Sequence, residues 1–82
     1  MLGNNKNSYA CAFGKVLRSL RVKAGISQEE LALDAEMQRN YISLIELGKN
    51  QPTVTSIFKL ANALNIAPSK LIKLVEEEIS SF

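Results

Sequence analysis

The chain contains no histidine and only one cysteine, Cys11, among its 82 residues. These absences exclude an internal disulfide and prevent assembly of the usual zinc ligand sets, which need several thiolates or imidazoles. A single thiol is compatible with a reducing compartment, so we expect a cytoplasmic protein. The chain also lacks a histidine base beside a nucleophile and a glycine-rich phosphate loop, so we expect no enzyme, no cofactor and no metal site.

Long hydrophobic runs are absent as well. No apolar stretch approaches the ~20 residues that a membrane-spanning helix requires, and residues 1–8, MLGNNKNS, lack the apolar core of a signal peptide. We therefore expect no membrane association, a flexible N-terminus over residues 1–8 and a single domain over residues 9–80. A hydrophobic content of 46% is enough for that domain to form a core without disulfides or metals.

Acidic and basic residues are distributed unevenly, although the net charge is only +2. Residues 1–25 contain basic groups and no acid, whereas residues 29–36 contain four acidic groups and no basic one. A polyanion would have to be held by a few charges together with backbone and amide donors, because no large basic surface is available. We expect modest non-specific affinity for such a partner.

The middle of the chain combines two short helical patterns with a tight turn between them. Ser27 can accept from the backbone N–H of Glu30 while the Glu30 side chain reaches back to Ser27, which is the capping box that begins a helix. The second pattern keeps Ile42 and Ile45 at inward spacing, and Gly48 suits the left-handed residue that ends a helix. Together they predict a helix-turn-helix.

Polar side chains begin the second of these helices, at Arg39 and Asn40. An α-helix fits the major groove of B-DNA, and its N-terminal residues lie nearest the base edges when it docks end first. A positive charge in the first helical turn opposes the helix dipole, so Arg39 at this position indicates an external anion or base. The alternative is an arginine that is merely solvated. We favour contact with DNA.

Residues 27–52, SQEELALDAEMQRNYISLIELGKNQP, resemble the helix-turn-helix family of phage Cro and lambda-type repressors, often called the Xre family. The usual pattern of that family is roughly SQEELA, a turn, and then R-x-Y-I-S-x-I-E-x-G-x-x-x-P. This chain matches it from Ser27 to Ala32 and from Arg39 to Pro52, and weaker similarity extends over residues 9–75. The R-x-Y-I-S core is also similar to that of controller proteins in restriction-modification systems.

The resemblance implies an all-α, five-helix lambda-repressor-like DNA-binding domain, with the helix-turn-helix at its second and third helices. It places base-reading side chains at Arg39, Asn40, Ser43 and Leu44. It places contacts to the DNA backbone at Gln28, Tyr41, Lys49 and Asn50. It also pairs Arg21 with Glu46 as a structural ion pair, and truncating one partner of such a buried pair typically costs ~3–5 kcal/mol.

Three residues depart from the family pattern. Leu44 stands where a small or polar residue is usual, so contact with a thymine methyl and a merely steric role are both open. Leu47 replaces a polar or basic residue beside the glycine, which implies that one phosphate contact is missing. Glu36 replaces the glycine of the turn, and a glutamate held at positive φ is strained by roughly 1–2 kcal/mol.

The last two helical patterns carry more apolar residues than their inward faces need. Asn65 is expected to end the fourth helix, and Pro68 takes the favoured first position of the fifth. The surplus predicts a homodimer interface made by Phe58, Leu71, Leu74, Val75 and Ile79. The alternative is that Leu74 and Val75 complete the core of a single chain.

These expectations describe a transcriptional regulator that binds double-stranded DNA as a homodimer on a palindromic operator, with restriction-modification genes as candidate targets. Two recognition helices would meet successive major-groove faces about 34 Å apart. Repression requires only occupancy, whereas activation requires contact with RNA polymerase, and the sequence leaves both open. A rival is an antitoxin or another protein-interaction module with the same fold, because fold alone does not decide function.

Overall fold

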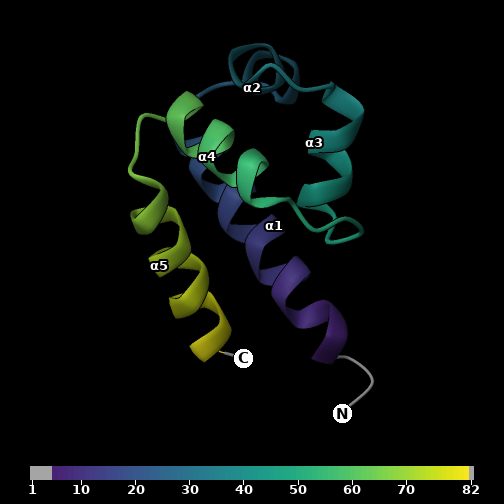
Figure 1. Ribbon diagram of the computed structural model, residues 1–82, viewed down its shortest axis with the longest axis vertical. Coiled ribbons are helices and arrows are strands. Elements are labelled where there is room, and N and C mark those ends of the chain that lie inside the picture. The colour runs from purple at the N-terminus through teal and green to yellow at the C-terminus, as the bar shows by residue number, and fades with distance from the viewer. Residues whose placement is uncertain (1–4, 82) are drawn as a thin grey trace.

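The computed structural model describes residues 5–81, which contain α-helices and no strand (Figure 1). The helices are α1 (Asn5–Lys23), α2 (Gln28–Ala35), α3 (Arg39–Glu46), α4 (Val54–Ala63) and α5 (Pro68–Ser80). The all-α, five-helix prediction is confirmed, and the two helices of the expected helix-turn-helix are α2 and α3.

The segment expected to be a flexible N-terminus, residues 1–8, is only partly described. Residues 1–4 of the segment expected to be flexible lie outside the described residues, whereas residues 5–8 belong to α1. These residues have no apolar periodicity, so their helical state could not be inferred from a pattern. Adding a residue to an existing helix requires no new nucleus, which allows polar residues at the start of α1 to continue the helix.

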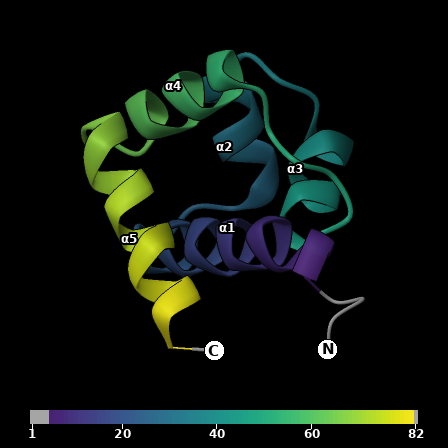
Figure 2. The ribbon, with the colours of Figure 1, turned by 60° about the horizontal axis from the view of Figure 1, so that its bottom comes forward.

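The helices close into a ring around one core. Contacts link α1 to α3, α3 to α2, α2 to α4, α4 to α5, and α5 back to α1, as Figure 2 shows. The large side chains with no exposed surface come from every helix: Leu17, Leu31, Ile42, Ile45, Leu60 and Leu71. Burial of each such side chain contributes roughly 1.5–3 kcal/mol. The whole ring, rather than any pair of helices, therefore holds the helix-turn-helix in place.

The predicted capping box of α2 is present. The backbone N–H of Glu30 donates to Ser27 Oγ at 3.0 Å, and the Ser27 N–H donates to Glu30 Oε1 at 2.8 Å. At the other end, Glu36 has a left-handed backbone with φ of 57° and ψ of 48°. The N–H of Met37 then donates to the Ala32 carbonyl at 2.8 Å. The turn thus has the left-handed backbone that the resemblance led us to expect, although a glutamate stands where a glycine was expected.

Glycine is required where α1 crosses α3. A Cβ on Gly14 would lie 2.4 Å from the Ile45 carbonyl oxygen and 2.7 Å from that of Glu46. Real Cβ atoms do not approach backbone atoms so closely, because the packed interior cannot yield without moving a helix. Gly14 therefore sets the close approach of α1 to the C-terminal end of α3.

The expected dimer interface needs correction on α5. Leu71 has no exposed surface and Val75 is only 9% exposed, so both belong to the core of the single chain. Residues four apart share a helix face, and α5 uses this pair to close the ring between α1 and α4. Leu74 and Ile79 are half-buried against the same core. Of the five expected interface residues, only Phe58 is largely exposed, at 58%.

Replacing Glu36 by glycine is expected to raise the free energy of unfolding by about 1 kcal/mol, because glycine adopts positive φ without steric strain. Urea denaturation followed by circular dichroism measures the change. Glu36→Ala is the control, since it removes the charge but keeps the Cβ. Equal stabilisation by alanine and glycine would show that the charge, and not backbone strain, is responsible.

Gly14→Ala is expected to lower the free energy of unfolding by about 1–3 kcal/mol through overpacking. Helix propensity alone predicts the opposite sign, because alanine is favoured over glycine inside a helix by roughly 0.5–1 kcal/mol. The matched control is Ser19→Ala at an exposed position of the same helix. If Gly14→Ala stabilised the protein as propensity predicts, the close crossing of α1 and α3 would be wrong.

Candidate nucleic-acid interface

The exposed face of α3 brings together the side chains that the sequence assigned to base reading. Ile42 and Ile45 anchor the opposite face in the core, with no exposed surface. Residues 39, 40, 43 and 44 follow at helical spacing on the outward side. Arg39 and Asn40 are exposed at the N-terminal end, while Ser43 and Leu44 are half-buried. This end of α3 therefore presents a guanidinium and an amide to an external partner.

The residues expected to contact the DNA backbone differ in how far they are exposed. Tyr41 is half-buried and packs against the core on the flank of α3. Lys49 is exposed and Asn50 is half-buried in the loop that follows Gly48, whose φ is +76°. The N–H groups of Lys49 and Asn50 both donate to the Leu44 carbonyl, at 2.9 and 3.3 Å, which fixes this loop to α3.

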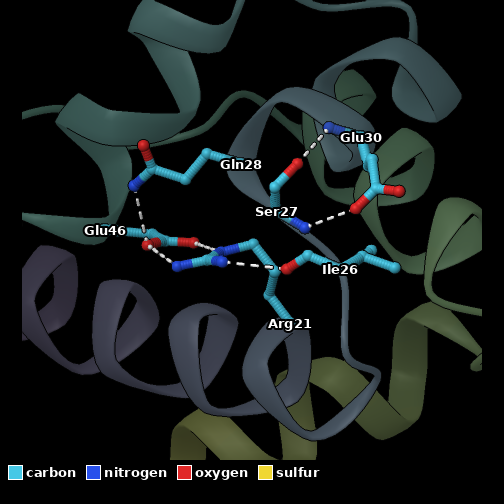
Figure 3. A network of polar contacts seen from close by, with 6 residues as sticks. All are labelled: Arg21, Ile26, Ser27, Gln28, Glu30 and Glu46. Atoms are coloured by element: carbon cyan, nitrogen blue, oxygen red, sulfur yellow. Dashed lines mark hydrogen bonds and ion pairs between the residues drawn. The ribbon is translucent and has the colours of Figure 1, made fainter.

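Arg21 and Glu46 form a bidentate ion pair between α1 and α3. Arg21 Nε donates to Glu46 Oε2 at 2.6 Å, and Arg21 Nη2 donates to Oε1 at 3.1 Å (Figure 3). The two side chains are only 12% and 3% exposed. The hydrogen bond to Glu46 raises the pKa of Arg21 above its ordinary value, although burial acts against the charged form. The pair is a fixed part of the scaffold at working pH.

The same pair reaches the start of α2. Arg21 Nη1 donates to the Ile26 carbonyl at 3.0 Å, and Gln28 Nε2 donates to Glu46 Oε1 at 3.0 Å. Figure 3 shows Gln28 reaching from α2 to the carboxylate that Arg21 approaches from α1. One amide hydrogen of Gln28 is thus used inside the protein. Its second amide hydrogen and the backbone N–H groups of Gln28 and Glu29 are left for a phosphate, whereas the N–H of Glu30 is used by the capping box.

Arg18 lies beside this network and was missed by the sequence analysis. A hollow of about 160 Å³ is lined by Arg18, Arg21, Gln28, Ser43, Glu46 and Leu47. A signal was available, because Arg18 follows Gly14 by four residues and precedes Arg21 by three, which places all three on one face of α1. The sequence alone did not show that this face of α1 lies against α3, which became clear only from the contact of Gly14 with α3.

Within residues 5–81, no helix is long and apolar enough to cross a membrane. In the same part of the chain, no group of three or more His, Cys, Asp or Glu side chains is placed to hold a metal ion.

Comparison with known proteins agrees with this geometry. The family model described as helix-turn-helix matches residues 17–71. Control protein C.BamHI of Bacillus amyloliquefaciens is 36% identical over 67 residues, which cover 80% of this chain and 83% of that protein.

Solved structures of controller proteins have the same fold. The restriction-modification controller protein C.AhdI from Aeromonas hydrophila has 40% sequence identity and a TM-score of 0.74, covering 76% of this chain and 94% of that one. The controller protein C.Esp1396I, solved as a tetramer with its natural 35 base-pair operator, has 25% identity and a TM-score of 0.80, covering 87% of this chain and 93% of that one. The chain therefore belongs to the helix-turn-helix family of transcriptional regulators that includes the restriction-modification control proteins.

Proposed function

We propose that this protein binds a palindromic DNA operator as a homodimer in the cytoplasm and regulates transcription of restriction-modification genes, without catalysing a reaction. The observation that carries the proposal is the exposed N-terminal end of α3, with Arg39 and Asn40 at its tip. The ion pair of Arg21 and Glu46 fixes the C-terminal end of α3 against α1, and the buried side chains of Ile42 and Ile45 anchor the rest of the helix in the core. A helix held in this way can enter the major groove as a rigid element.

The chemistry of this end suits base recognition. An arginine can donate two hydrogen bonds to guanine O6 and N7, and an asparagine can pair with adenine N6 and N7. Ser43 can donate to or accept from either base, and Leu44 offers an apolar surface to a thymine methyl. Phosphate contacts from Gln28, Tyr41, Lys49 and Asn50 would fix the register of the helix on the duplex.

Similarity to the control proteins supports the proposal that the protein binds an operator and regulates restriction-modification genes. C.Esp1396I binds its natural operator as a tetramer, and a tetramer on DNA is readily built from two dimers on adjacent symmetric sites. Two linked recognition helices raise affinity because the second contact becomes intramolecular. Contact with RNA polymerase would be needed only for activation, which depends on where the operator lies relative to a promoter.

The surface that best fits dimerisation lies between α4 and α5. Val54, Phe58 and Ile72 are 71%, 58% and 45% exposed, and all three line one hollow with Ile57 and Pro68. Contiguous exposed apolar side chains indicate an interaction surface more strongly than scattered ones do. We propose this α4–α5 surface as the dimer interface in place of the residues that the structure assigns to the core.

Arg39→Ala is expected to reduce discrimination between the preferred operator and its single-base variants by about 1–3 kcal/mol at one position. Selection of bound duplexes from a random pool, followed by anisotropy titrations, measures this preference. Lys59→Ala is the control, because it removes an equal charge from an exposed position on α4. An unchanged preference in Arg39→Ala, or an unselective wild-type protein, would favour a protein-interaction module.

Phe58→Glu is expected to convert the dimer into a folded monomer, because two charges would be buried at the paired surface. Analytical ultracentrifugation gives the mass, and circular dichroism tests the fold. Leu33→Glu makes the same change at an isolated residue of α2 that is 74% exposed, and it should stay dimeric. A dimeric Phe58→Glu variant would exclude the α4–α5 surface. Val75 was also expected in the dimer interface, but Val75→Glu cannot test dimerisation because it would place a charge in the core of the single chain.

A further inference from the structure

One face of α1 lies against the C-terminal end of α3 and the residues that follow it. Gly14 touches the carbonyls at the end of α3, and Arg21 binds Glu46. Cys11 lies on the same face of α1, since its sulfur is 2.9 Å from where a Cβ of Gly48 would be. Arg18 falls between Gly14 and Arg21 on the same face. Because Arg18 shares this face of α1, it is directed toward α3 and away from α5.

The hollow that Arg18 lines opens beside the recognition surface. Ser43 of α3 and Leu47, the residue that follows α3, line it, and they lie about one and two turns beyond Arg39 on the outward side. A duplex that contacts Arg39 would therefore pass its backbone close to this hollow. At about 160 Å³ the hollow is well below the roughly 300 Å³ at which small-molecule pockets begin. A single phosphate group is a better match than an organic cofactor.

The charges in the hollow leave one cation unbalanced. Both oxygens of Glu46 accept hydrogen bonds, one from Arg21 and the other from Arg21 and Gln28. The pair of Arg21 and Glu46 is thus neutral and closed. Arg18 is exposed and has no hydrogen bond or ion pair with any residue in the described part of the chain. Its guanidinium is available to an external anion.

We propose that Arg18 binds a phosphate of the operator backbone at this hollow, supplying from α1 the contact that Leu47 cannot make from the end of α3. Leu47 is 63% exposed and has no polar group, yet it lines the same hollow. A guanidinium can bind a phosphate through two parallel hydrogen bonds, so an arginine on the neighbouring helix can take over this role. The inference rests on the proposed DNA-binding function and extends it to a residue on α1.

The test compares Arg18→Ala with Lys23→Ala on a labelled mixed-sequence duplex and on the selected operator, over a series of salt concentrations. Lys23 is an exposed residue of α1 that lines a separate hollow shared with α5, so it is a charge-matched control on the other side of the helix. Loss of one phosphate contact should weaken binding to both duplexes by the same factor and reduce the salt slope by about one. Lys23→Ala should keep the wild-type slope.

A second arm tests whether the two positions are interchangeable. Adding Leu47→Arg to Arg18→Ala should restore the salt slope, because a guanidinium again reaches the hollow. A wild-type slope in Arg18→Ala, equal losses in the two alanine variants, or no recovery in the double variant would each overturn the inference. If these results appeared while operator preference still depended on Arg39, the proposed DNA-binding function would stand and only the role of Arg18 would be wrong. If the wild-type protein showed no operator preference at all, the proposed function and the role of Arg18 would both be wrong. Thermal melting should show that Arg18→Ala is folded.

Discussion

The ion pair of Arg21 and Glu46 is the interaction on which the surface that we propose to face DNA depends. It joins α1 to α3 directly, and it reaches the start of α2 through the Ile26 carbonyl and Gln28. Burying two charges requires their removal from water, so such a pair adds little net stability over an apolar contact. A single partner left buried would be strongly destabilising, however, and this penalises every arrangement of α1, α2 and α3 except the paired one. The pair therefore specifies orientation more than it adds stability.

The two sides of α1 explain why so small a protein can hold a recognition helix firmly. Toward α3, Gly14 permits backbone contact and Arg21 supplies the charge, so this side is close and polar. Elsewhere α1 supplies Phe13, Val16 and Leu17 to the core that α5 helps to close. The apolar contacts provide the free energy of folding. The polar contacts use that rigid support to set the geometry of α3.

Local chemistry in the sequence was enough to predict the helix-turn-helix and its ends. The capping box at Ser27 depends on residues three apart, and the positive φ of Glu36 was anticipated because the family has glycine there. The contacts between distant helices could not be derived in the same way. The Arg21 and Glu46 pair was available only through resemblance, since 25 residues separate its members. Leu71 and Val75 were misplaced because their burial depends on which helix lies opposite, and the place of Arg18 beside the hollow could not be derived for the same reason.

A rigid recognition helix has particular value in a protein with so little basic surface. Exposed carboxylates at Glu29, Asp34 and Glu36 occupy α2 and the turn, and they oppose the approach of phosphates. General electrostatic attraction is correspondingly weak, so affinity has to come from a few directed contacts. Ordering a mobile helix on binding would use up part of that affinity. In the proposed function, buried contacts hold α3 before DNA arrives, so less of the contact energy is used to order the helix and more is available to separate the right sequence from the wrong ones.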